Sequence, residues 1–279
     1  MLLANEVPGR HASGRGAHRR VVTTTKGIKK TPGDGQDRIE WLDANKRLFR
    51  VRPLGPDHVR DIRPGRLARI PPRFKGQTNY HGRYFFASLG VHVEHESMNE
   101  FTGLMLVDHL HVVTAVAAQP MLLTFANGRN HVPDFLATLS DGRRLLIDVH
   151  ESRSTTEADA ELFELTREMC ARVGWDYEVV DRLDDVFRWN LEWMNRYHHP
   201  RYAPAPDVRQ RILSLAGRAR TFGELRKALA TDRPGEHIPA LAHLMWQREV
   251  LFDLHAPLED TSRVWTAHRP DTAHLSPRT

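Results

Sequence analysis

The stretch that most constrains the fold is residues 119–150, in which short turn sequences separate three apolar segments. The segments are residues 121–125, 133–139 and 145–149. Asn127-Gly128 follows the first segment, and Ser140-Asp141-Gly142 follows the second. Asn-Gly and Asp-Gly between apolar runs are typical of β-hairpins. The pattern therefore predicts three short strands of one sheet, joined by tight turns.

Two acidic residues lie within this predicted sheet. Asp134 stands at the start of one strand and Asp148 at the end of the next. A buried carboxylate is costly unless it is paired or binds a cation. Neighbouring hairpin strands would bring the two carboxylates together, and Mg²⁺ favours carboxylates combined with phosphate oxygens. The alternative for either acid alone is a strand-edge cap, a turn former or a surface charge.

The segment before the sheet predicts a capped helix followed by a strand. Ser97 and Glu100 have the spacing of a capping box, and capping alone is a sufficient role for Glu100. Apolar residues continue at helical spacing after it. Residues 112–118 form a predicted strand that leads to Gln119. A glutamine there either orients substrate or water, or only makes a hydrogen bond in the core.

These motifs together resemble those of TnsA-like transposon endonucleases, heteromeric transposase subunits in the PD-(D/E)xK nuclease superfamily. The shared order is Glu-Ser-x-x-Glu, helix, Gln-Pro, strand, Pro-Asp-Phe, Asp-Gly, strand, Asp-Val-x, and the resemblance covers roughly residues 71–265. It implies an α/β fold, with a restriction-endonuclease-like mixed sheet flanked by helices and followed by a small winged-helix domain.

The same resemblance implies a catalytic site and its partners. Mg²⁺ (or Mn²⁺) would be held by Glu100, Asp134 and Asp148, with the Val149 carbonyl as a further ligand and Gln119 in a supporting role. The implied partners are double-stranded DNA at transposon ends, a transposase subunit and an ATP-using regulator. The implied reaction is hydrolysis of a DNA phosphodiester bond.

One position departs from the family pattern. The family has Lys two residues after the second acid, where this chain has His150. Lys would stabilise charge on the attacking water or the phosphate, whereas His is neutral much of the time near neutral pH and acts as an acid or base. Two hypotheses follow: a metal-dependent DNA endonuclease, or a non-catalytic DNA- and transposase-binding subunit that retains the nuclease fold.

Basic charge is concentrated at the N-terminus. Residues 1–80 contain 18 Lys or Arg against 7 Asp or Glu, whereas the remainder contains 22 against 28. Such a segment attracts polyanions, of which DNA is the obvious one. Residues 1–70 are therefore expected to form a basic, largely extended or disordered arm; the alternative is an arm with no specific partner. The candidate DNA-binding residues in this arm are Arg19, Arg20, Lys26, Lys29 and Lys30.

The rest of the chain predicts a helix-rich continuation. A nuclease-like catalytic domain is expected over residues 71–200, a winged helix-turn-helix over 201–265 and a flexible tail over 266–279. After His150 the pattern predicts a helix over residues 154–173, a strand over 175–180 and a helix over 186–197. Beyond a Pro-rich boundary it predicts helices over 208–215, 222–229 and 238–246, and strands over 249–254 and 262–265. Three helices and a wing are typical of a winged helix. Residues 238–246 have no Arg or Lys, which favours protein contact or weak DNA contact.

The single cysteine, Cys170, excludes an intramolecular disulfide and a Cys-based zinc cluster. No apolar run reaches the length of a membrane span, and the N-terminus lacks the apolar core of a signal peptide. The expected location is the cytoplasm, associated with the nucleoid, with no membrane partner.

Overall fold

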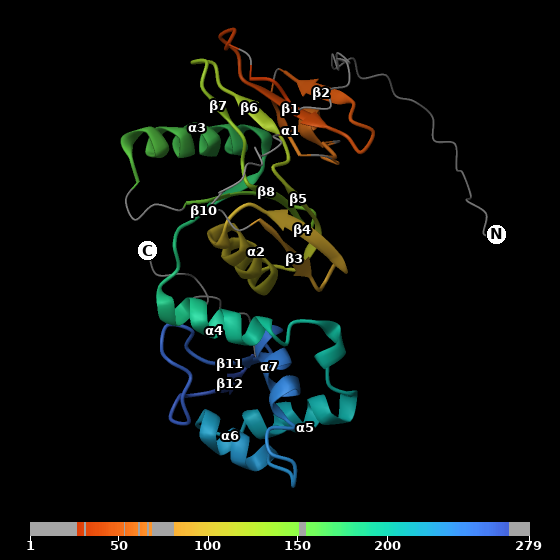
Figure 1. Cartoon of the computed structure of the whole chain (residues 1–279), viewed down its shortest axis with the longest axis vertical. Coiled ribbons are helices and arrows are strands. Elements are labelled where there is room, and N and C mark those ends of the chain that lie inside the picture. The colour runs from red at the N-terminus through yellow and green to blue at the C-terminus, as the bar shows by residue number, and fades with distance from the viewer. Residues whose placement is uncertain are drawn as a thin grey trace, which may run out of the picture.

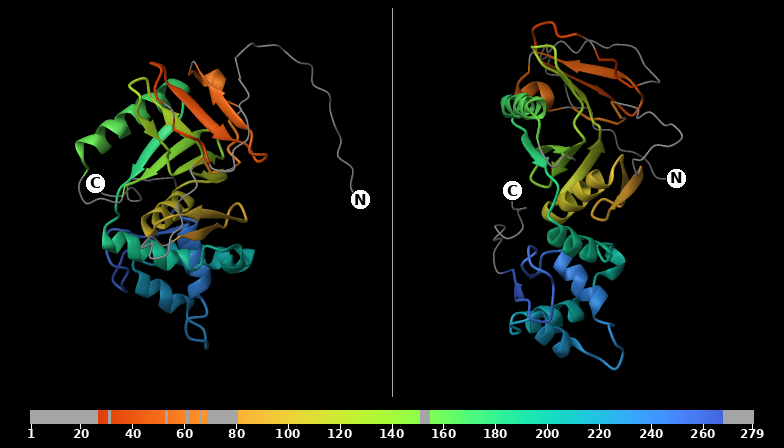
Figure 2. Two further views of the ribbon diagram at one scale, coloured as in Figure 1. Left: turned by 45° about the horizontal axis from the view of Figure 1, so that its top comes forward. Right: turned by 60° about the vertical axis from the view of Figure 1, so that its left-hand side comes forward.

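The computed structural model describes residues 27–30, 32–52, 54–60, 62–65, 67–68, 81–150 and 155–267. The fold is mixed α/β, as predicted. The elements are stacked along one direction: a sheet built on β1 lies at one end, a second four-stranded sheet lies in the middle, and the C-terminal helices lie at the other end (Figure 1). The views in Figure 2 keep the same order.

The central sheet contains β5 (Val113–Ala118), β8 (Phe135–Leu139), β9 (Arg144–Val149) and β10 (Asp176–Val180), in the order β10-β9-β8-β5. β5 and β9 are antiparallel to β8, and β10 is parallel to β9. The parallel pair requires a crossover, which α3 (Glu157–Val173) supplies. The predicted order of helix, strand and helix after His150 is confirmed.

Both faces of the central sheet are buried. Ile147 belongs to one apolar cluster together with residues of α2 (Met98–Leu110), such as Leu104. Leu146 belongs to another, together with Met169 of α3. Successive side chains of a strand point to opposite faces. The continuous apolar run in β9 therefore reflects a strand covered by a helix on each side.

Capping residues and glycines determine where these helices and strands begin and end. Ser97 caps α2, accepting a hydrogen bond from the Glu100 amide at 3.1 Å. Thr156 and Asp159 form a capping box at the start of α3, and Gly174 ends that helix with φ +72°. Gly142, with φ +86°, permits the tight turn between β8 and β9.

A second four-stranded sheet departs from the prediction in two ways. Its strands are β1 (Arg38–Leu42), β2 (Leu48–Val51), β6 (Leu122–Thr124) and β7 (Asn130–His131), all antiparallel in the order β2-β1-β6-β7. The first predicted strand of the 119–150 stretch, β6, therefore pairs with β1 and not with the other two strands. Residues 38–51 are also not an extended arm, because Ile39 and Trp41 are buried in the core beside Leu123.

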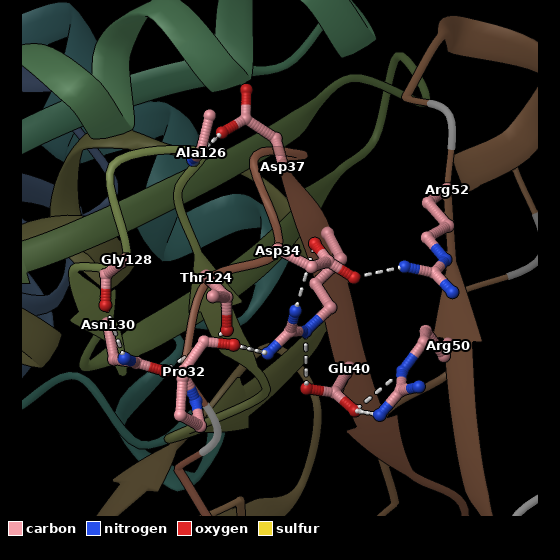
Figure 3. Close-up of polar contacts among 11 residues, drawn as sticks. Pro32, Asp34, Asp37, Glu40, Arg50, Arg52, Thr124, Ala126, Gly128 and Asn130 are labelled. Carbon is pink, nitrogen blue, oxygen red and sulfur yellow. Dashed lines mark hydrogen bonds and ion pairs between the residues drawn. The ribbon is translucent and has the colours of Figure 1, made fainter.

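The outer surface of this sheet contains a network of charges. Glu40 is 1% exposed and accepts hydrogen bonds from Arg38 at 3.2 Å and from Arg50 at 2.5 and 2.8 Å. Asp34 accepts from Arg38 and from Arg52, at 3.5 and 2.5 Å. Figure 3 shows the contact of Glu40 with Arg50, which links β1 to β2, and the contact of Asp34 with Arg52, which links the segment before β1 to the residue after β2. Each buried charge thus has an opposite charge beside it.

Three shorter elements complete the N-terminal and central parts. Residues between β2 and the central sheet include the short helix α1 (Pro56–Val59). β3 (Gly82–Phe86) and β4 (Val91–His95) form an antiparallel hairpin that packs on α2. No helix among the described residues is long and apolar enough to cross a membrane.

The C-terminal part follows the predicted order of helices. After α4 (Asp185–Asn195) and the 3-10 turn η1 (Pro200–Tyr202) come α5 (Pro206–Ala216), α6 (Phe222–Leu229) and α7 (Ile238–Trp246). β11 (Val250–Leu251) and β12 (Trp265–Thr266) then pair antiparallel, and both are shorter than expected. The apolar core of this part is continuous with that of the central sheet.

Candidate functional site

Hydrogen bonds to the backbone bring three of the predicted site residues together at one end of the central sheet. The Gln119 amide, just after β5, donates to the Asp134 carbonyl at 2.6 Å. The Asp134 carboxylate, just before β8, accepts from the Val149 amide at 2.7 Å, at the end of β9. Asp134 therefore continues the ladder between β8 and β9 with its side chain, and Gln119, Asp134 and Val149 are neighbours.

Helix α2 brings its first turn to the same end of the sheet. Gly103 packs so closely on β9 that a Cβ atom at this position would lie 2.7 Å from Cγ2 of Val149. Glu100 is one helical turn before Gly103. The Ser97 hydroxyl accepts from the Glu100 amide, so the predicted cap at Ser97 is confirmed, while the Glu100 carboxylate accepts a hydrogen bond from the amide of Glu96, the residue before the cap, at 2.8 Å.

A cleft of about 790 Å³ opens beside this first turn. Glu96, Glu100 and Gln119 line it, together with His81, Arg83 and His95. Gln119 Nε2 donates to the Glu96 carboxylate, which fixes the orientation of the amide group. Two acidic residues and one amide residue thus line a single cleft.

Gln119 is unusual in both backbone and side chain. Its φ is +41°, a region that costs a residue other than Gly roughly 1 to 3 kcal/mol. Its side-chain Oε1 is buried and has no hydrogen-bond partner among the described residues. Buried polar atoms are almost always paired, because an unpaired oxygen loses its hydration without compensation. Strain and an unpaired acceptor at one residue are typical of a functional position.

Asp148 and His150 lie on the opposite face of β9. Ile147 and Val149 pack on the α2 side of the sheet, so the side chains of Asp148 and His150 face α3. Asp148 is 3% exposed and accepts hydrogen bonds from His131 Nε2 at 2.7 Å and the Tyr177 hydroxyl at 2.5 Å. Burial and the Asp148 charge raise the pKa of Tyr177, so this hydroxyl keeps its proton and remains a donor.

His150 has its own partners on that face. Its Nδ1 lies 3.1 Å from Asp181 Oδ1, and its ring packs edge-on against Phe163 of α3. Asp148 thus faces away from α2, the helix that carries Glu100. Sequence reasoning missed His131 and Tyr177 because a strand buried on both faces gives no alternation that reveals which way an acid points.

The predicted DNA-binding residues are only partly described. Lys29 and Lys30 are exposed, just before β1. Arg19, Arg20 and Lys26 lie outside the described residues.

The donor atoms at the cleft suit a hard divalent cation. Mg²⁺ and Ca²⁺ take oxygen ligands from carboxylates, amides and backbone carbonyls. Within the described ranges, no three His, Cys, Asp or Glu side chains are placed to hold a metal ion together. A site at Glu100 and Asp134 would therefore need amide or backbone oxygens, and Gln119 and Val149 are the residues hydrogen-bonded to Asp134 through their backbone amides. No protein-family model matches the chain, and no curated protein matches its sequence.

Proposed function

We propose that the chain is a metal-dependent DNA endonuclease subunit of a TnsA-like transposition system, which hydrolyses a phosphodiester bond at transposon ends. The observation that carries the proposal is the unpaired, buried amide oxygen of Gln119, a residue that lines the same cleft as Glu96 and Glu100. The hydrogen bond from the Gln119 amide to the Asp134 carbonyl makes Asp134, the other acidic candidate ligand, a neighbour of Gln119.

In this proposal Glu100, Asp134, the Gln119 amide oxygen and the Val149 carbonyl hold the cation. This set contains only two acidic side chains, which agrees with the lack of a three-residue cluster in the described ranges. When bound, such a cation lowers the pKa of a water molecule and polarises a phosphate. Glu96 orients the Gln119 amide through its hydrogen bond to Nε2.

Asp148 takes a positioning role in this arrangement. By accepting hydrogen bonds from His131 and Tyr177, it holds β9 against β7 and β10. The position of Val149, the next residue, depends on that support.

The mixed sheet with a helix on each face supports a nuclease-like core in outline. The three C-terminal helices with a two-stranded hairpin support a winged helix, which we assign to contact with the transposase subunit.

Calorimetry with Mn²⁺ on the full chain, with and without duplex DNA, tests the site before any partner is known. We expect saturable binding by the unaltered chain and at least a tenfold loss of affinity in Glu100→Gln and in Asp134→Asn. Gln at position 100 can still accept from the Glu96 amide, and Asn at position 134 can still accept from the Val149 amide.

Glu224→Gln is the matched control. Glu224 has the same capping geometry in α6, with the Arg220 amide donating to its carboxylate at 2.8 Å. This variant should bind Mn²⁺ as the unaltered chain does. Equal affinity in all four proteins would refute the proposed ligands. Where binding is found, nicking of a labelled duplex in Mg²⁺, alone and with a transposase subunit and its ATP-using regulator, tests the reaction.

A second candidate function is a non-catalytic DNA- and transposase-binding subunit. The observation that favours it is the engagement of Asp148 and His150, which the resemblance places in the catalytic set, with protein groups on the α3 side of β9. DNA binding without Mn²⁺ binding under either condition would establish this function and exclude the endonuclease.

A further inference from the structure

A second hollow, of about 630 Å³, lies between the α1 segment and the turn that joins β8 to β9. Four arginines line it: Arg60, Arg63, Arg143 and Arg144. Its remaining walls are largely apolar, from residues such as Val116, Leu136 and Trp175. The charged side chains that line this hollow are therefore all positive, and only carboxylates outside the lining could compensate them.

Two of the four arginines have carboxylate partners. Arg143 contacts both Asp141 and Asp176 at 2.7 Å. Arg60 contacts Asp57 at 3.0 Å, an exposed pair within the α1 segment. These two side chains carry a charge that is already compensated.

Arg63 and Arg144 are held differently. Arg144 donates to the carbonyls of Ile62 and Arg60, at 3.0 and 3.4 Å. Arg63 donates to the same two carbonyls, at 3.4 and 3.1 Å. Sharing two acceptors places the guanidinium groups close together. Neither is paired with a carboxylate among the described residues.

This arrangement has an electrostatic cost that an anion would remove. Burial, and then the charge of Arg63, lower the pKa of Arg144. A guanidinium group has more N–H donors than these carbonyl contacts use, and Arg binds phosphate oxygens through such donors. The walls are fixed by the α1 segment and by β9, so the pair is preorganised.

We propose that Arg63 and Arg144 bind a phosphate of the DNA backbone. This proposal rests on the proposed nuclease function, and it adds the path that the DNA takes over the protein surface. β5 is the outer strand of the central sheet, and its residues Ala115 to Ala117 line the arginine hollow, while Ala118 and Gln119 line the carboxylate cleft. At about 3.3 Å per residue, the midpoints of these two lining stretches are roughly 8 Å apart along the chain. DNA lying along β5 reaches both.

The test is the salt dependence of duplex binding by the full chain, measured by fluorescence anisotropy. Each lost phosphate contact lowers the slope of log K against log salt by about 0.9. Because the two arginines bind one phosphate, we expect Arg63→Gln/Arg144→Gln to lower the slope by about 0.9 and to weaken binding at low salt by tenfold or more. Arg143→Gln, at the same hollow but already paired, is the control and should leave the slope unchanged.

The variants must be folded for the comparison to hold. Arg144 also braces the α1 segment through two carbonyls. If the double variant unfolds early, Arg63→Gln alone, at a more exposed position, replaces it and should lower the slope by about half as much, because Arg144 still contacts the phosphate. A slope equal to that of the unaltered chain in either folded variant overturns the proposal, whether or not metal binding and nicking are found.

A second experiment tests the arginine site independently of the proposed nuclease function. Inorganic pyrophosphate is titrated into the unaltered chain and the double variant. If the unaltered chain binds no duplex, but binds pyrophosphate through these arginines, the anion site stands while the DNA assignment is overturned. If neither probe distinguishes the two proteins, the anion site itself is refuted.

Discussion

The Tyr177 hydroxyl donates a hydrogen bond of 2.5 Å to Asp148 Oδ2, and His131 Nε2 lies 2.7 Å from the same oxygen. One carboxylate therefore joins β10 of the central sheet to β7 of the other sheet. Because β9 lies between these contacts, its last residues are fixed from the side opposite α2.

Tyr177→Phe should destabilise the fold by about 1 to 3 kcal/mol, since it leaves a buried carboxylate with one donor fewer. Urea unfolding followed by tryptophan fluorescence measures this directly. Tyr202→Phe is the control, because that hydroxyl contacts only the exposed Arg201 side chain among the described residues. An unchanged midpoint in Tyr177→Phe would show that Asp148 does not depend on this contact.

Among single changes in the sheet formed by β2, β1, β6 and β7, Glu40→Gln should lower the free energy of unfolding the most. Glu40 and Arg38 are 1% and 3% exposed, so removing the negative charge leaves a buried guanidinium poorly compensated. Removing one partner of a buried ion pair costs about 3 to 5 kcal/mol. Asp34→Asn, which alters an exposed partner of the same arginine, should change stability far less. Equal effects in the two variants would contradict the buried network.

Gly103→Ala should push α2 away from β9, because the added methyl group would lie 2.7 Å from Val149 Cγ2. Overpacking of this kind costs about 1 to 3 kcal/mol. Val149→Ala on the same chain removes the clashing group. The double variant should therefore be more stable than the sum of the two single effects predicts. Strict additivity would show that the contact is relieved elsewhere.

Asp108→Asn should change how stability depends on pH. Burial raises the pKa of Asp108 to about 6, with the Tyr84 hydrogen bond opposing the shift. The folded state then binds this proton more tightly than the unfolded chain, so the Asp108 contribution is present below about pH 4 and is lost as pH rises through about 6. Relative to the unaltered chain, the variant should gain about 3 kcal/mol over that interval.

The measurement for Asp108 is a set of urea unfolding curves between about pH 4 and 7, compared as a difference between the two proteins. The difference is required because burial lowers the pKa of the neighbouring His109 to about 3. His109 therefore stabilises the fold increasingly as pH rises over the same interval, which offsets Asp108 in the unaltered chain. A difference that is flat with pH would refute the raised pKa.

Much of the fold was predictable because local signals agree with tertiary packing. Gly128 and Gly142 have positive φ in the turns where Asn-Gly and Asp-Gly predicted them. Ser97 and Thr221 cap helices where their spacing to Glu predicted it. The three C-terminal helices begin and end within two residues of the predicted limits.

What was not predictable depends on pairing between distant segments. Because β6 lies close to β8 in the sequence, the two were expected in one sheet. β6 instead pairs with β1, about 80 residues earlier. Arg-rich composition over residues 38–51 suggested an arm, because no local pattern tells that Arg50 will be neutralised by Glu40 of the neighbouring strand. The orientation of Asp148 was hidden for the same reason, since its partners come from β7 and β10.

The continuous apolar core between the central sheet and the C-terminal helices governs how the molecule loses its structure. His109 of α2 lies 3.0 Å from the Trp246 carbonyl of α7, and Arg248 donates to the Leu110 carbonyl at 2.7 Å. With Leu104 and Leu244 in one cluster, neither part can melt without uncovering the other. The Pro-rich segment that looks like a boundary in the sequence is thus not a thermodynamic one, and these two parts share a single cooperative transition.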